Sequence, residues 1–195
     1  TEHLSLYQLT IEPGTRFATL AAKGALELPD ADLAADLFDA TREIAGNAGL
    51  PAYEVSNHAR PGAESRHNLT YWRYGDYAGV GPGAHGRRNG VATQRRRKPE
   101  NWIARVGDIG HGIEAEEPLP PATQAVEALL MGLRLGEGVD LSRIAARNGG
   151  DARVDMATLA LLERQGLVAR AGDRLCVTER GMSVLEAILR EIVCA

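Results

Sequence analysis

The chain has 195 residues, a hydrophobic content of 44% and a charged content of 25%, as expected for one large or two small globular domains. Its formal net charge of −4 argues against a general nucleic-acid binder, because such proteins carry a basic surplus. No apolar run approaches the roughly 20 residues that span a bilayer, and no signal peptide is recognised, so we expect a cytosolic protein without a membrane span.

The two cysteines, Cys176 and Cys194, are far apart, and neither belongs to a CxxC pair or a three-cysteine cluster. Cytosolic proteins rarely keep structural disulfides, so we interpret both residues as buried or incidental thiols. The sequence therefore predicts that this chain alone holds neither an iron–sulfur cluster nor a structural zinc ion.

The first part of the chain predicts alternating strands and helices. An apolar run over residues 3–11 is typical of a buried strand, and helices are expected over residues 16–23 and 30–48. A short strand is expected over residues 51–56, and a further one over residues 77–83. Strands separated by such long connections predict parallel pairing in an α/β layer or barrel, and three strands are too few to close a barrel.

The chain starts at Thr1 and enters its first expected strand without a lead-in, so we interpret it as a fragment of a longer protein. Removal of preceding barrel strands would leave one strand edge unpaired. Such edges tend to pair with another copy, so a dimer or higher oligomer is expected.

The stretch from His67 to Arg97 is the part of the chain richest in reactive side chains. His67 and Asn68 lie next to the aromatic pair Tyr71 and Trp72, which offers flat apolar faces beside a nitrogen that can bind iron. A glycine-rich run over residues 79–86 would let the backbone approach a ligand closely. The alternative is that the histidine, asparagine and aromatic side chains simply pack together in the core.

A β-hairpin is expected over residues 87–97, turning at Asn89 and Gly90 and carrying a cluster of arginines. Clustered arginine either binds carboxylates or phosphates, or forms a solvated edge that discourages strand pairing. A short helix over residues 99–106, with Trp102 facing inward, should follow the hairpin.

A connector rich in glycine and proline over residues 111–121 is expected to separate a first domain, residues 1–110, from a second, residues 122–195. In the second domain, helices and then a hairpin turning at Gly172 and Asp173 follow the order of a winged helix. Between Leu119 and the end of the chain, nine arginines face ten acidic residues. A DNA-reading surface would be basic, so we interpret this domain as a packing module without nucleic-acid partners.

The chain contains the stretches HLSLYQLTIEPGT, YEVSNHARPG and RHNLTYWRYGDYAGVGPGAH, and then GLV followed by LCVTERG. Together they resemble the carboxy-terminal half of the oxygen-independent coproporphyrinogen III oxidase family of radical SAM proteins. Within the third stretch, HNLTYW matches the HNxxYW pattern typical of the HemW-type heme chaperones. The resemblance implies an incomplete (β/α)6 barrel followed by the family's helical, winged-helix-like carboxy-terminal domain.

The resemblance also implies a [4Fe–4S] cluster and S-adenosylmethionine in the full-length parent, bound through a CxxxCxxC loop that this chain does not contain. We therefore expect the fragment itself to be catalytically inactive. The favoured function is a HemW-type heme chaperone, which passes heme to an unknown acceptor protein. The first alternative is a true coproporphyrinogen III oxidase, which decarboxylates propionates. The second, from another class, is a DNA-binding winged helix.

Residue by residue, the resemblance makes His67 the expected heme contact and iron ligand, with Asn68, Tyr71 and Trp72 orienting or stacking on the porphyrin. The family pattern places Glu54 and Asn57 near the active cavity. It also places Gly81, Gly83 and His85 near the S-adenosylmethionine region. The chain departs from many relatives at His58, where they carry an aromatic residue, and at Ser65, where they carry cysteine.

Overall fold

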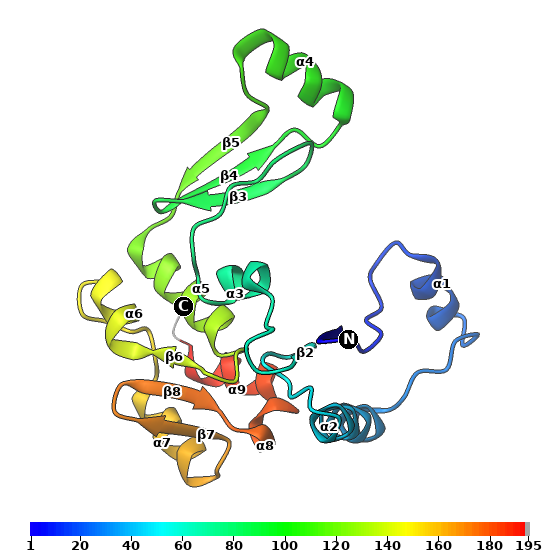
Figure 1. The fold of residues 1–195 in the computed structure, drawn as a ribbon, viewed down its shortest axis with the longest axis vertical. Coiled ribbons are helices and arrows are strands. Elements are labelled where there is room, and N and C mark those ends of the chain that lie inside the picture. The colour runs from blue at the N-terminus through cyan, green and yellow to red at the C-terminus, as the bar shows by residue number, and fades with distance from the viewer. Residues whose placement is uncertain (194–195) are drawn as a thin grey trace. The chain divides into compact units, whose positions relative to one another are not determined.

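The computed structural model describes residues 1–193 and divides the chain into two compact units, the first covering residues 1–64 and the second starting at Ser65. The interpretation of Cys194 as an incidental thiol falls outside the described residues. The first unit contains β1 (His3–Ser5), α1 (Arg16–Ala22), α2 (Ala31–Asn47) and β2 (Asn57–Ala59), as Figure 1 shows.

The second unit begins with α3 (Arg66–Trp72), β3 (His85–Arg88), β4 (Val91–Arg95), α4 (Pro99–Ile109), β5 (Ile113–Pro118) and α5 (Pro121–Gly132). It continues with β6 (Val139–Asp140), α6 (Leu141–Arg147), α7 (Met156–Arg164), β7 (Val168–Ala171), β8 (Arg174–Val177), α8 (Glu179–Met182) and α9 (Leu185–Ile192). The α/β class expected from the sequence is thereby confirmed.

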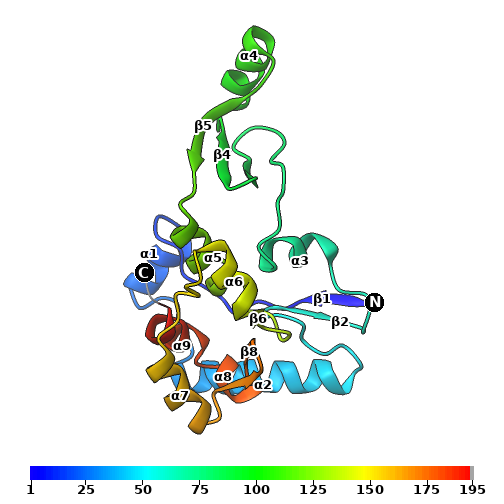
Figure 2. The same ribbon diagram turned by 90° about the vertical axis from the view of Figure 1, so that its left-hand side faces the viewer.

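The strands of the first unit differ from the prediction in length and direction. β1 ends at Ser5, and it pairs antiparallel with β2, with His3 opposite Ala59, so the expected parallel pairing is wrong (Figure 2). Residues 51–56 form bends and isolated bridge positions rather than a strand, because the chain doubles back there and the amide of Tyr53 donates to the carbonyl of Asn57. This short reversal sends the chain back in the opposite direction as it enters β2. A parallel pair would instead need a long crossover connection.

The two helices of the first unit form where the sequence predicted them. Thr15 caps α1 and Asp30 caps α2, each accepting a hydrogen bond from a backbone amide of the first turn. The apolar stripe of α2 is left open, since Leu33, Leu37 and Ile44 are 49%, 49% and 71% exposed. The first unit therefore buries few of the apolar side chains that its helical periodicity provides.

The sheet of the second unit that carries the predicted hairpin has the strand order β3-β4-β5. The hairpin and its turn are confirmed, because Asn89 and Gly90 adopt φ of 52° and 72°, as a two-residue turn of this type requires. The expected connector is wrong in one respect: residues 113–118 form β5, which pairs with β4 and places Glu116 opposite Thr93. The expected strand over residues 77–83 reduces to a single bridge between Tyr77 and Arg87.

The carboxy-terminal part of the second unit holds most of the core. Predicted helices at α5, α6 and α7 and the hairpin β7–β8 are present, and the short β6 adds a third strand beside β8. Leu129, Leu133, Leu159 and Leu175 are completely buried. After the hairpin β7–β8 the chain forms two helices, α8 and α9, which are separated at Ser183 and Val184. Among residues 1–193, every helix is too short or too polar to span a lipid bilayer.

Candidate heme-contact helix and its surroundings

The short helix α3 carries the HNxxYW residues. It begins after Ser65, whose hydroxyl accepts a hydrogen bond from the amide of Asn68, and a capping serine of this kind satisfies a backbone donor that the helix leaves free. Residues four positions apart share one face of a helix, so His67 and Tyr71 lie together, and Asn68 lies with Trp72. The motif is thus divided between two faces.

The first face presents a row of three rings. The ring centroids of His67 and Tyr71 are 4.8 Å apart in an edge-on arrangement, and those of Tyr71 and Tyr77 are 4.4 Å apart. His67 is exposed, and its Nδ1 lies 3.4 Å from the side-chain oxygen of Asn68. An exposed imidazole can ligate iron through its other nitrogen, and the neighbouring phenol rings offer faces for a flat ligand.

A cavity of about 330 Å³ adjoins this row. It lies between the strands β3 and β4 and the helix α5, and Tyr77, His85 and Met131 are among its lining residues. Tyr77 is therefore the link between the aromatic row and the cavity. The structure thus brings His67, Tyr71 and His85 into one neighbourhood of the second unit, through Tyr77, which was not among the expected site residues.

Trp72 contributes to a different cavity, of about 350 Å³, which is lined mainly by residues of α5, β6 and α6. At its rim, Arg73 donates from Nε and Nη2 to the two carboxylate oxygens of Glu137, both at 2.8 Å. This hydrogen bonding holds the pKa of Glu137 below its usual range. The structure therefore does not place Trp72 beside His67 and Tyr71, as stacking on a single porphyrin face would require.

The glycine-rich segment over residues 79–86 allows two stretches of backbone to lie in close contact. A methyl group at Gly79 would lie 2.2 Å from the carbonyl oxygen of His85, and one at Gly86 would lie 2.9 Å from the backbone nitrogen of Gly79. Gly81 and Gly83 instead adopt φ of 91° and 71°, which favour glycine. Two glycines thus permit the approach of two chain segments, and two others permit the turn between them.

A buried cluster anchors the segment after α3 to the hairpin and to α5. Tyr74 is 5% exposed and donates from its hydroxyl to Oε2 of Glu127 at 2.5 Å. The guanidinium of Arg87 lies 3.4 Å from the centroid of the Tyr74 ring and donates to the carbonyl of Gly75 at 3.0 Å. Burial, followed by the bond to Glu127, raises the pKa of Tyr74, so the phenol stays protonated and donates.

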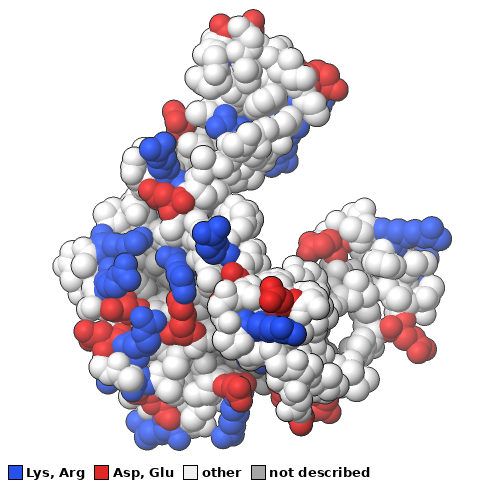
Figure 3. Space-filling view, viewed as in Figure 1, with Lys and Arg blue, Asp and Glu red and all other residues white. Residues whose placement is uncertain are grey.

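This cluster changes the interpretation of the basic hairpin. Arg87 is buried and belongs to the packing of the second unit, whereas Arg88, Arg97 and Lys98 are exposed. The sequence did not distinguish Arg87 from its basic neighbours, because the partners Tyr74 and Glu127 are distant in the chain. On the face shown in Figure 3, basic and acidic side chains are interspersed over the helical part of the second unit.

The remaining expected site residues, Glu54 and Asn57, belong to the first unit. Both are buried, and Asn57 donates from Nδ2 to Oε1 of Glu54, while the backbone amide of Ser56 donates to Oε2 at 3.0 Å. Ser5 donates from its hydroxyl to Oδ1 of Asn57 at 2.5 Å. These bonds join β1 to β2 and occupy both carboxylate oxygens, so Glu54 has a structural role here.

The residues present do not fit an iron–sulfur cluster. Among residues 1–193, no three histidine, cysteine, aspartate or glutamate side chains gather as a metal site would require. Cys176 on β8 is partly exposed and directs its thiol to the carbonyl of Ala169 at 3.6 Å. Axial ligation of heme needs only one imidazole, and His67 is an exposed imidazole of α3.

Comparison with known proteins agrees with the resemblance found in the sequence. The HemN C-terminal domain model matches residues 119–184. The mitochondrial radical S-adenosyl methionine domain-containing protein 1 of Bos taurus is 44% identical over 146 residues, which cover 71% of this chain and 33% of that protein. The heme chaperone HemW of Mycobacterium tuberculosis is 33% identical over 192 residues, which cover 98% of this chain and 47% of that protein.

HemW of Escherichia coli is also similar, with 33% identity over 192 residues covering 96% of this chain and 48% of that protein. The solved structure of the coproporphyrinogen III oxidase HemN from Escherichia coli matches 97% of this chain and 47% of its own, with a TM-score of 0.68. Its sequence identity of 18% shows a likeness of fold alone. The chain spans a third to about half of the length of these relatives, and it belongs to the HemN/HemW family of radical SAM proteins, where it corresponds to the carboxy-terminal half.

Proposed function

We propose that this chain is the carboxy-terminal part of a HemW-type heme chaperone and that it contacts heme through α3. His67 would act as the axial ligand, and Tyr71 and Tyr77 would pack against the porphyrin. The observation that best supports this proposal is the exposed imidazole of His67. Its ring lies edge-on to that of Tyr71, with the two ring centroids 4.8 Å apart. Heme supplies the iron centre that the acceptor protein would eventually receive.

The cavity beside Tyr77 gives the proposal a place for part of the ligand. Its volume of about 330 Å³ is at the lower end of the range for ligand pockets, so a porphyrin would be partly exposed. Partial exposure suits a carrier, because the ligand must pass to another protein. Met131 and the ring of Tyr77 supply apolar contact, and His85 lies at the same cavity as a second imidazole.

Hemin titration followed by the Soret band tests the assignment. We expect His67→Ala to weaken hemin binding by at least tenfold, which corresponds to about 1.4 kcal/mol. His111→Ala is the matched control, because His111 is an exposed histidine of the same unit outside α3 and its cavities. Equal affinity and an equal Soret maximum for the His67→Ala protein and the unaltered protein would remove the assignment.

The alternative function, coproporphyrinogen III oxidation, draws on the fold likeness to HemN. Relatives that are 32% to 33% identical to the chain carry the heme-chaperone name, whereas the oxidase HemN is 18% identical, and we therefore favour the chaperone. In either case we propose that the [4Fe–4S] cluster and S-adenosylmethionine belong to the other half of the longer protein. A CxxxCxxC sequence in the gene upstream of Thr1 is the expected observation.

We also propose that the first unit completes its fold with further strands of a radical SAM barrel. The open apolar stripe of α2, with Leu33, Leu37 and Ile44, supports this, because helices of α/β folds cover a sheet with such a stripe. Without those strands, the same surfaces would pair two copies of the chain. Light scattering is expected to give a dimer or larger species, and a clean monomer at high concentration would contradict this.

Two finer assignments accompany the proposal. The helices α5 to α7 with the hairpin β7–β8 would form a winged-helix-like packing module starting near residue 122, supported by the family-model match from residue 119. The cytosol is the proposed location.

A DNA titration tests whether the winged-helix-like module binds nucleic acid. Mixed-sequence DNA at low salt should give no change in fluorescence anisotropy, since even nonspecific binders respond under those conditions.

A further inference from the structure

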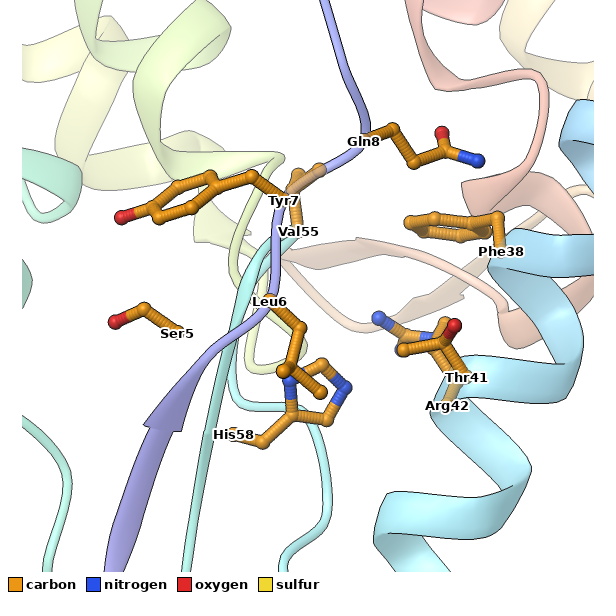
Figure 4. Close-up of a pocket in the computed structure, with 9 residues that line it drawn as sticks. All are labelled: Ser5, Leu6, Tyr7, Gln8, Phe38, Thr41, Arg42, Val55 and His58. Carbon is orange, nitrogen blue, oxygen red and sulfur yellow. The ribbon is translucent and has the colours of Figure 1, made fainter.

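The first unit contains a cavity that none of the proposed heme contacts touches. It has a volume of about 320 Å³ and lies between α2 and the segment that continues from β1. Figure 4 shows Phe38, Thr41 and Arg42 approaching it from α2, and the imidazole of His58 lying beneath Leu6. All the lining residues belong to residues 1–64, so the cavity lies within the first unit.

His58 is the feature that makes this cavity unusual. The side chain is 1% exposed, and among the described residues neither ring nitrogen has a partner at ordinary hydrogen-bond geometry; the nearby backbone of Ser56 only opposes the lowering of the pKa of the ring. A neutral imidazole has one donor and one acceptor, and buried polar groups nearly always have a partner. The backbone of His58 is held in β2 opposite Leu4, which fixes the point from which the ring enters the cavity.

The surroundings of His58 define the chemistry of the missing partner. Burial and the nearby charge of Arg42 lower the pKa of His58, so the ring is neutral and offers one N–H. The guanidinium of Arg42 lies 5.4 Å from the centroid of the Phe38 ring at the same cavity. The guanidinium of Arg42 and the ring of His58 both line the cavity, and two nitrogen donors of this kind, one of them charged, can bind the two oxygens of a carboxylate.

The other lining residues are partly apolar and partly polar. The hydroxyl of Ser5 donates to Asn57, that of Thr41 donates to the carbonyl of Leu37, and Tyr7 is 75% exposed. Leu6, Phe38 and Val55 line the cavity, and the amide nitrogen of Gln8 is already bound to the carbonyl of Ala34 at 2.6 Å. The carboxylate of Glu54, also near His58, is occupied by Asn57 and by the amide of Ser56. A ligand that fits this cavity therefore needs an anionic group for Arg42 and His58 and a compact apolar body for Leu6, Phe38 and Val55.

We propose that the cavity between α2 and β2 is a binding site for a small amphipathic carboxylate, with Arg42 and His58 holding the carboxylate and Leu6, Phe38 and Val55 holding the apolar body. The site is separate from the proposed heme contact, because no residue of α3 lines it. Hemin binding should not depend on it.

NMR with the full chain tests the proposal, using 4-phenylbutyrate as the probe and 4-phenylbutanamide, its neutral analogue, as the comparison. Millimolar affinity is expected of a ligand with so few atoms, so each compound is titrated to about 10 mM. Phenylbutyrate should shift the ring signals of His58 and Phe38 in a saturable manner. The amide should bind at least tenfold more weakly, since it cannot pair with Arg42 as an anion.

Two variants locate the anion site. Arg42→Met should weaken phenylbutyrate binding at least tenfold and leave amide binding unchanged, while His58→Phe should abolish binding of both by filling the cavity. Arg60→Met, which removes an exposed arginine of the same unit away from the cavity, is the matched control. The Arg42 result stands alone should the His58 variant fail to fold.

Three outcomes would overturn the proposal. The first is the absence of saturable shifts at His58, which would leave water as the partner of its ring. The second is equal binding of acid and amide, which would indicate an apolar cavity without anion recognition. The third is an equal loss of affinity in the Arg60→Met and Arg42→Met proteins, which would indicate nonspecific attraction to surface charge.

Discussion

The hydroxyl of Tyr74 is the part of the buried Tyr74–Arg87–Glu127 cluster that a single substitution can isolate. Tyr74→Phe keeps the ring under the guanidinium of Arg87 and removes only the 2.5 Å bond to Glu127. A hydrogen bond to a charged group contributes about 1.5–3 kcal/mol to stability. The side chain of Glu127 is 40% exposed, and water can replace part of the lost bond, so we expect a loss of about 1–1.5 kcal/mol.

Urea unfolding followed by tryptophan fluorescence and far-UV circular dichroism measures this loss, with an unchanged slope if the transition stays two-state. A double-mutant cycle with Glu127→Ala should return a coupling energy of about 1 kcal/mol, because each single change removes the same bond. The raised pKa of Tyr74 adds a second readout. Its stabilisation is complete below pH 10, the ordinary tyrosine pKa, and is lost as the pH rises toward the folded pKa.

The unaltered protein should therefore lose its advantage over Tyr74→Phe only in alkaline solution. Tyr74→Leu extends the series by removing the contact with Arg87, and an additional loss of about 0.5–2 kcal/mol is expected for a desolvated cation–π pair. Equal stability of the Tyr74→Phe and unaltered proteins, or strictly additive effects in the cycle, would refute the view that this bond joins the segment after α3 to α5.

The other predictions concern the core, a glycine and a histidine. Leu129→Ala, at a fully buried position of α5, should lower the free energy of unfolding by about 2–5 kcal/mol. Leu161→Ala, at a position 45% exposed on α7, should lower it by less than about 1 kcal/mol. Similar urea midpoints for the two variants would contradict this packing. Gly138→Ala should destabilise more than Gly172→Ala, although both glycines have φ near 64°, because a methyl group at Gly138 would lie 2.0 Å from the carbonyl oxygen of Leu175 and one at Gly172 meets nothing. The shared φ costs about 1–2 kcal/mol in each variant, so equal unfolding free energies would exclude the steric term. The lowered pKa of His58 means that the unfolded chain binds a proton that the folded chain does not, so stability should fall as the pH drops below 6.5, by up to about 1.4 kcal/mol per pH unit. His58→Gln should flatten that part of the pH profile, and an unchanged profile would place the acid sensitivity elsewhere.

Much of the local structure was predictable because its causes are local in the chain. Asp30 caps α2 from three residues away, and Asn89 and Gly90 turn the hairpin through their own backbone angles. Family membership was likewise visible in short stretches, above all in the six residues from His67 to Trp72. The helix α3 itself was not predicted, although Ser65 as its cap was a local signal that could have indicated it.

The errors occurred where a segment needs a partner that is distant in the chain. An apolar run over residues 3–11 does not specify which strand lies beside it, and the partner β2 left it with three paired residues. Residues 113–118 contain proline and glutamate and were expected to connect domains, but β4 offered them an edge to pair with.

The sequence by itself determined most of the helices, the hairpin turn and the family of this protein, because capping, turn chemistry and motif spacing act over a few residues. Only the tertiary structure decided which side chains of the candidate site meet. It separated Trp72 from His67 and Tyr71, joined Tyr77 to them, and buried Arg87 against Tyr74. The physical reason is that each face of α3 pairs a polar side chain with an aromatic one. The sequence does not show which of these faces other elements cover.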